Sequence, residues 1–138
     1  MNFQLHFFNF WPLLIGAISN MIIGALWYSP ILFGKVWMKL AGITEADIEK
    51  ENSSKSMLLG LIPSILSVFF LYLMLAISNA NSFLEALSIG TIASVGFAGM
   101  TLLNNVIFEK RPFKLFLLNV GYAFVAWNIA AIIITIWK

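Results

Sequence analysis

The sequence contains no cysteine and a single histidine. Without cysteine there are no disulfides, no thiolate metal ligands and no cysteine nucleophile. A metal site usually needs three or four protein ligands, and the single histidine, His6, precedes the first apolar segment, where an imidazole is more often a structural hydrogen-bonding group. We therefore expect no metal site and no cofactor.

Charge is also scarce, because only 10% of the residues are charged whereas 61% are hydrophobic. Soluble globular chains have about 25% charged and about 45–50% apolar residues. A soluble chain of 138 residues must leave much of its surface in water, so this composition indicates a protein whose solvent is lipid. The basic residues flank apolar segments and do not form one broad field, which argues against a nucleic-acid partner and makes membrane lipid the expected partner.

Motifs for catalysis are missing as well. A serine hydrolase needs a base near its nucleophile, and no histidine lies in an apolar run. There is no glycine-rich loop of the kind that cradles phosphates. We expect a protein that is not an enzyme and has no catalytic residues.

What the sequence does have is four long apolar runs, near residues 11–30, 57–78, 83–107 and 115–137. Each is long enough to cross about 30 Å of hydrocarbon as a helix of about 20 residues. Only helices and closed barrels satisfy their own backbone in lipid, and these runs lack a period of two, so they predict helices. The predicted fold is all-α: a single domain over residues 1–138, forming a polytopic transmembrane four-helix bundle with a short interfacial helix in the cytoplasmic link 31–56.

Two links hold seven of the eight basic residues: Lys35, Lys39, Lys50 and Lys55 in the first, and Lys110, Arg111 and Lys114 in the second. The positive-inside rule places both links in the cytoplasm and both termini outside. Residues 1–10 contain no lysine or arginine, so the first run is not a typical signal peptide and should be retained. We expect a multi-pass protein of the cell membrane, which in a bacterium is the cytoplasmic membrane.

Two short patterns predict helix starts. Ser82 and Glu85 have the spacing of a capping box at the start of the third run. Thr44 and Asp47 make a similar start for a helix of about two turns in the first link.

Residues 24–37, GALWYSPILFGKVW, interrupt the apolar pattern. Trp27 and Tyr28 each combine an apolar ring with one polar atom, which suits the headgroup boundary. Pro30 disfavours helical geometry at Ser29, so the first helix should leave the hydrocarbon there.

The following segment, 31–41, is too short to span a membrane. We predict that it lies along the interface, where a set of aromatic and basic residues would meet lipid headgroups: Trp27, Tyr28, Lys35, Trp37 and Lys39. The alternative is that it folds back and plugs the cytoplasmic mouth of the bundle.

One family has a similar signature. The matching residues are Gly24, Trp27-Tyr28-Ser29-Pro30, Phe33-Gly34-Lys35, Trp37, Gly42-Ile43-Thr44 and Gly121-Tyr122. Through them the chain resembles the bacterial and fungal integral membrane family called domain of unknown function 1761. The resemblance covers nearly the whole chain and implies the four-span plan, but it implies no activity.

Polar residues within the runs lie on faces rich in small residues; they are Asn20, Ser94, Asn105, Asn119 and Tyr122. An unpaired amide in lipid costs a few kcal/mol, so these side chains must face protein or water. One explanation is a packing seam in which each interhelical hydrogen bond contributes about 0.6–2 kcal/mol. The other is a polar cavity for a small solute, an ion or a lipid headgroup.

Three functions are therefore open. The leading hypothesis is a non-enzymatic bundle that associates, through its small-residue faces, with itself or with another membrane component. The second is a small-solute or ion permease that works as a homo-oligomer, its pathway lined by the polar faces. The third is a lipid-binding module in which the interfacial aromatic and lysine residues hold a headgroup.

Overall fold

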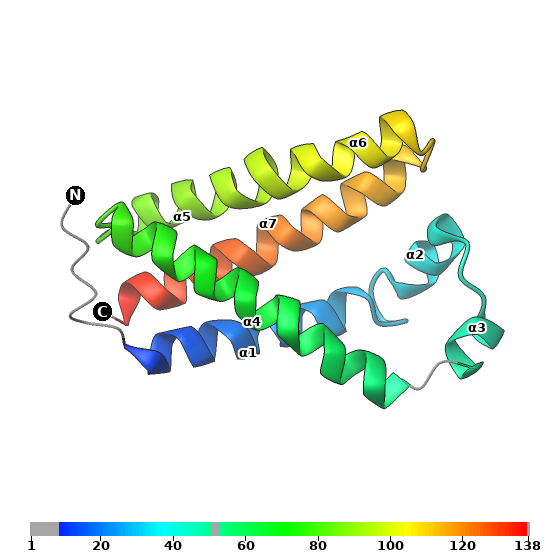
Figure 1. The fold of residues 1–138 in the computed structure, drawn as a ribbon, viewed down its shortest axis with the longest axis horizontal. Helices are drawn as coiled ribbons and strands as arrows, with labels where there is room; N and C mark the ends of the chain where they lie inside the picture. The colour runs from blue at the N-terminus through cyan, green and yellow to red at the C-terminus, as the bar shows by residue number, and fades with distance from the viewer. Residues whose placement is uncertain (1–8, 51–52, 138) are drawn as a thin grey trace.

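The computed structural model describes residues 9–50 and 53–137, and over these ranges the chain is helical apart from turns (Figure 1). Four helical spans are long and apolar enough to cross a membrane, and they confirm the predicted all-α transmembrane bundle. They are α1 (Phe10–Trp27), α4 (Ser53–Ile77), the composite third span α5–η2–α6 (Phe83–Thr91, Ile92–Gly99 and Met100–Phe108) and α7 (Phe113–Ile136). His6, discussed above as a lone imidazole, lies outside the described residues.

The link after the first span contains two short helices, α2 (Gly34–Ala41) and α3 (Glu45–Lys50). Helix α1 ends at Trp27, three residues before the predicted end, because Tyr28 leaves the helical conformation and the Ser29 amide donates to the Leu26 carbonyl in a tighter turn. At α3 the Thr44 amide donates to the Asp47 carboxylate at 2.9 Å, and the Asp47 amide donates to the Thr44 hydroxyl at 3.2 Å. These reciprocal bonds start the short helix as the sequence pattern indicates.

The predicted capping box at the start of α5 is confirmed. The Ser82 hydroxyl accepts from the Glu85 amide at 3.2 Å, and the Glu85 carboxylate accepts from the Ser82 amide at 3.0 Å. These bonds satisfy two amides that the helix itself leaves without partners.

The two ends of the bundle differ in charge. Helices α2 and α3 and the turn at 109–112 lie together at one end, which we call the basic end (Figure 1). The turn at 78–82 and the end of α7 lie at the other, which we call the neutral end. Both basic links are thus on one side of the bundle, and the cytoplasmic orientation of that side stays a prediction.

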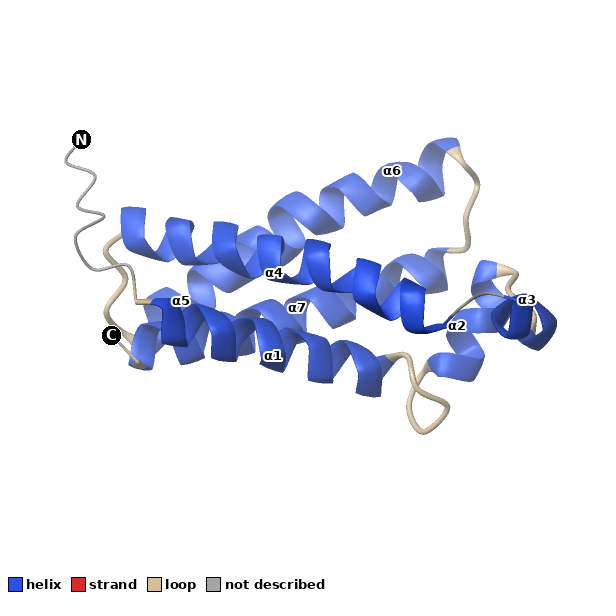
Figure 2. Ribbon diagram, turned by 60° about the horizontal axis from the view of Figure 1, so that its bottom comes forward, coloured by secondary structure: helices blue, strands red, loops and turns tan. Residues whose placement is uncertain are grey.

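Helix α7 is central and packs against α1, α4 and the third span (Figures 1 and 2). Ala126, Ala130 and Ala131 on α7 are fully buried, so neighbouring backbones can approach closely. The close approach continues at Gly90 of α5, where an added Cβ would lie 2.6 Å from the Asn128 Oδ1 of α7.

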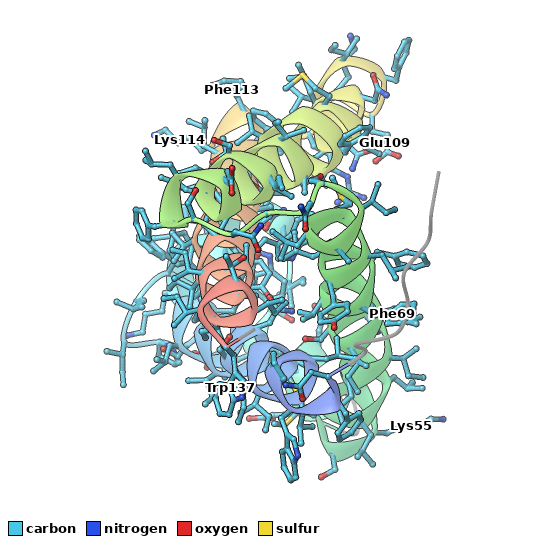
Figure 3. The ribbon with its side chains drawn as sticks, turned by 90° about the vertical axis from the view of Figure 1, so that its left-hand side faces the viewer. Lys55, Phe69, Glu109, Phe113, Lys114 and Trp137 are labelled. Atoms are coloured by element: carbon cyan, nitrogen blue, oxygen red, sulfur yellow. The ribbon has the colours of Figure 1, made fainter. Side chains whose placement is uncertain are left out.

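The half of α4 nearest the basic end diverges from the bundle. Figure 3, seen from the neutral end, places Lys55 of α4 on the opposite side of the molecule from Glu109. Three successive residues, Met57, Leu58 and Leu59, are more than half exposed, so this part of α4 is uncovered around most of its circumference. In a membrane these side chains would face lipid.

The third span is not a uniform α-helix. Its middle segment, η2, has the wider π-helical turn and is rich in small residues. The buried Ser94 hydroxyl in this segment donates to the Gly90 carbonyl one turn earlier at 2.7 Å. Hydropathy alone predicted an ordinary helix here, because it carries no information on the width of a helical turn.

Candidate functional site

The turn between α1 and α2 is tightly bonded. The Phe33 amide donates to the Trp27 carbonyl at 3.0 Å, and the Gly34 amide donates to the Ser29 carbonyl at 2.8 Å. A Cβ on Gly34 would lie 2.5 Å from the Tyr28 carbonyl oxygen, which is too close for any side chain. Glycine at position 34 is therefore required for the turn that sets the direction of α2.

Five aromatic side chains meet beside this turn: Trp27, Tyr28, Phe33, Trp37 and Tyr122, which we call the aromatic cluster. The ring of Tyr28 lies 5.4 Å from that of Trp37 and 5.4 Å from that of Tyr122, both edge to face. Such pairs contribute about 0.5–1.5 kcal/mol beyond their burial. The cluster joins α1, α2 and α7 at the basic end.

Trp27 is also held directly against α7. Its Nε1 donates to the Leu118 carbonyl at 3.1 Å. A Cβ on Gly121 would lie 3.1 Å from Trp27 Cζ2, so the glycine makes room for the indole ring. The signature residues that carried the family resemblance are thus largely packed against one another.

Two separate sets of hydrogen bonds connect the tyrosines of the aromatic cluster to polar residues of the spans. The Tyr28 hydroxyl donates to Asn119 Oδ1 at 2.8 Å, and the Tyr122 hydroxyl donates to Asn20 Oδ1 at 3.3 Å. Asn20 Nδ2 donates to Ser64 Oγ of α4 at 2.7 Å. Ser64 was not predicted, because a serine in an apolar run carries no signal of its interhelical partner.

Tyr28 follows the last residue of α1. Its burial, with a smaller contribution from the neighbouring Tyr122, raises the pKa of its hydroxyl well above the usual tyrosine range. The hydroxyl therefore stays protonated and keeps its role as the donor to Asn119.

The five predicted polar residues do not line one cavity. Asn20 is bonded to Tyr122, whereas Asn119 is bonded to Tyr28. Ser94 is bonded within its own helix. Asn105 faces Asn119 across a separate cavity of about 50 Å³ between α6 and α7.

An open cleft of about 520 Å³ lies at the basic end, between the C-terminus of α2 and the turn at 109–112. We call it the basic cleft; its lining residues are Lys39, Leu40, Ala41, Gly42, Glu109, Lys110, Arg111, Pro112 and Leu115. Three cationic side chains and one carboxylate leave it a formal charge of +2. The two cationic segments are about 70 residues apart in sequence and meet only because α2 packs against α7.

The turn at 109–112 has a special backbone. Lys110 adopts a left-handed conformation, with φ of 56°. That conformation costs a residue with a Cβ about 1–2 kcal/mol and is more usual for glycine or asparagine. The amides of Glu109 and Arg111 both donate to the Asn105 carbonyl, which holds the turn closed above the end of α6.

Arg111 pairs with Glu109 through Nε and Oε2 at 2.8 Å, and both side chains are about half exposed. Exposed ion pairs contribute little, typically about 0–1 kcal/mol. The pair therefore holds the two side chains together only weakly.

The interfacial residues predicted from sequence separate into two groups. Trp27, Tyr28 and Trp37 are half-buried in the aromatic cluster, and Lys35 is exposed outside the cleft. Of the five predicted residues, Lys39 alone lines the basic cleft. Helix α2 packs against α7 and keeps both of its lysines exposed.

From the sequence, Lys110 and Arg111 indicated the side of the membrane on which the second basic link lies, and no binding role was predicted for them. The positive-inside rule predicted both basic links on the same side of the membrane, and this was the indication in the sequence that the two links could meet. Among residues 9–50 and 53–137, no three histidine, cysteine, aspartate or glutamate side chains gather as a metal site would require.

The small-residue faces are occupied within the chain. A Cβ on Gly16 would lie 3.1 Å from Val68, and one on Gly24 would lie 3.2 Å from the Tyr122 hydroxyl. Gly90 packs against Asn128 in the same way. These faces serve the packing of the bundle itself.

The chain matches a known protein family. A family model described as "Protein of unknown function (DUF1761)" matches residues 11–135. No curated protein and no solved structure matches the chain.

Proposed function

The chain belongs to the DUF1761 family, whose description assigns no function, and from the geometry of its basic end we propose that this membrane protein binds an anionic, phosphate-bearing group in the basic cleft. The observation that carries the proposal is the convergence of Lys39 with Lys110 and Arg111 on one open cleft. The proposed role is binding, with no chemical step.

The side chains suit a phosphate. A lysine ammonium acts as a point charge, whereas the arginine guanidinium presents a planar fork that matches two phosphate oxygens. The cleft also borders the first residues of α7, where Pro112 is the N-cap. The positive end of the helix dipole adds to the attraction. Glu109 opposes binding, but it is already paired with Arg111.

The position of the cleft suits a ligand at the membrane boundary. It lies beyond the ends of the apolar spans and next to the aromatic cluster, which contains side chains of the type found at headgroup level. Both a lipid headgroup and a soluble phosphate compound offer the required chemistry.

Single substitutions in the cleft test the proposal. Purified protein in mild detergent would be titrated with dioleoyl phosphatidylglycerol, and bound lipid measured by native mass spectrometry. Lys39→Gln, Lys110→Asn and Arg111→Gln should each weaken binding about fivefold, since a basic residue near an anionic lipid contributes about 1 kcal/mol. Asparagine is chosen at position 110 because it tolerates the left-handed backbone.

Matched controls come from the same segments. Lys35→Gln removes a charge from α2, and Lys114→Gln removes one from α7; neither residue lines the cleft. Both should bind lipid within about twofold of the unaltered protein, because neither side chain lines the cleft and salt screens exposed charges that the ligand does not contact. Equal losses in cleft and control variants would contradict the proposal, because they would indicate a general charge effect.

Self-association is a second candidate, favoured by the uncovered half of α4. Gly60 lies in this region, and a Cβ there would meet no atom within 4 Å. A second helix could therefore approach closely at this position. The same mass spectra count the subunits, so a defined oligomer would support self-association and a monomer would contradict it.

The permease hypothesis receives less support. Three of its four expected lining residues are already hydrogen-bonded within the bundle: Asn20 to Tyr122, Asn119 to Tyr28 and Ser94 to Gly90. A pathway would require these bonds to be exchanged for contacts with the solute.

A further inference from the structure

The basic cleft has a neighbour that bears on the identity of its ligand. The cavity of about 50 Å³ between α6 and α7 shares Arg111, Pro112 and Leu115 with the cleft. Its remaining lining residues are Leu102, Asn105, Val106, Phe116 and Asn119. The two cavities are therefore adjacent, one charged and the other containing two carboxamides.

The small cavity lies deeper along the spans than the cleft does. Asn119 follows Pro112 by seven residues of α7, which corresponds to about 10 Å along a helix axis. Asn105 is on α6, before the turn at 109–112. A ligand that fills both cavities would present a phosphate at the surface and a polar, uncharged group on the membrane side of it.

Asn105 gives an independent indication of a ligand. Its side chain is half-buried within the apolar third span, and among the described residues no side-chain hydrogen bond to it is formed. Asn105 lies three residues before the end of α6, so its carboxamide is placed to donate to a ligand near the membrane boundary. Asn119 already accepts a hydrogen bond from Tyr28 through Oδ1, so its amide group is oriented.

Resting on the proposed function, we infer that the ligand is a membrane glycerophospholipid, whose phosphate occupies the basic cleft and whose ester carbonyls accept hydrogen bonds from the amide groups of Asn105 and Asn119. In such a lipid the ester groups lie on the acyl side of the phosphate, as the order of the two cavities requires. Large exposed apolar side chains at the same end, including Phe108, Phe113 and Leu117, provide the surface for the acyl chains. A soluble phosphate compound has no acyl chains to cover this apolar surface.

An ether lipid separates this inference from simple charge attraction. Full-length protein in mild detergent would be titrated with dioleoyl phosphatidylglycerol and, in parallel, with its dialkyl ether analogue, which has the same headgroup but no ester carbonyls. The ester lipid should bind about 25-fold more tightly, about fivefold for each of two ordinary hydrogen bonds. Asn105→Leu should reduce this difference to about fivefold, whereas Asn104→Leu, on the adjacent exposed residue outside both cavities, should preserve it.

The remaining measurements distinguish a lipid ligand from a soluble phosphate compound. Glycerol 3-phosphate, which has the charge but no acyl chains, should fail to displace the lipid at millimolar concentration; displacement at micromolar concentration would identify a soluble ligand and overturn the inference. Equal binding of ester and ether lipids by the unaltered protein would also overturn it, and this comparison needs no variant to fold. If the two lipids bind equally but Lys39→Gln still weakens both, the proposed function stands without the inference. If Lys39→Gln and Lys35→Gln weaken lipid binding equally, the proposed function of the basic cleft is itself wrong.

Discussion

Asn20 illustrates what a single polar residue in an apolar span requires. An asparagine at that depth must have a partner, and it has two, Ser64 of α4 and Tyr122 of α7. The requirement was predictable from the cost of burying an amide. The identity of the partners was not, because any polar group on a facing helix would satisfy it.

Asp47 provides a test at the same scale, because it is exposed and outside the spans. The Thr44 backbone amide, and to a lesser extent the Thr44 hydroxyl, hold the pKa of its carboxyl below the usual value of 3.8. Because the pKa is lower in the folded state, the charged cap stabilises α3 at pH values above the pKa of Asp47 in the unfolded chain. This stabilisation is lost as the pH falls through the lowered pKa of the folded state. NMR titration of the carboxyl carbon should report the lowered pKa directly.

Thr44→Val removes the hydroxyl and leaves the backbone amide in place. The pKa of Asp47 should therefore rise only part of the way to its usual value, since the amide makes the larger contribution. A return to the full usual value would assign the effect to the hydroxyl instead. An ordinary pKa in the unaltered protein would show that the cap is not formed.

At the scale of elements, α2 determines whether the basic cleft exists. It supplies Lys39, and its position depends on the turn at Gly34 and on the packing of Trp37 against Tyr28. The sequence predicted a short helix with an aromatic face and flanking lysines. Its contact with α7 depends on the shapes of both surfaces, which no local pattern contains.

Gly34→Ala should disrupt this arrangement. The new Cβ would lie 2.5 Å from the Tyr28 carbonyl oxygen, so the turn must open and move α2 away from α7. We expect a loss of about 1–3 kcal/mol in stability, as for other overpacked sites. Thermal unfolding in detergent, followed by tryptophan fluorescence, would measure the loss, and lipid binding should weaken at least as much as in Lys39→Gln.

Gly60→Ala is the matched control for this substitution. Its Cβ would meet no atom within 4 Å, and alanine favours a helix over glycine by about 1 kcal/mol. The melting temperature should stay the same or rise slightly, with lipid binding unchanged. If Gly34→Ala behaved like this control, the turn would not hold α2 in place.

For the whole molecule, the two ends of the bundle must face opposite sides of a membrane. Because the chain has no cysteine, single cysteines are unique labels. Ser54 and Asn81 are exposed and lie toward the basic and neutral ends, respectively. With the basic end in the cytoplasm, an impermeant maleimide should label Asn81→Cys in intact cells and Ser54→Cys only after permeabilisation.

The outcomes of the labelling experiment differ in meaning. Labelling of both variants in intact cells would contradict the four-span arrangement. Labelling of Ser54→Cys alone would keep the bundle and reverse its orientation, which would place the basic cleft at the outer surface. The positive-inside rule argues for the first orientation, because seven of the eight basic residues lie in the two links of the basic end.

The sequence by itself determined the four spans, the basic links on one side and the caps at Thr44 and Ser82. Each depends on local content: the hydropathy of about 20 residues, the count of lysines, or the spacing of two side chains. Only the tertiary structure decided that α7 is central, that Asn20 meets Ser64, and that Lys39 meets Lys110 and Arg111. Lipid chains are as apolar as leucine, so hydropathy predicts that a helix lies in the membrane but not which helices pack beside it. The neighbours are determined by close packing of complementary surfaces, such as Gly121 against Trp27.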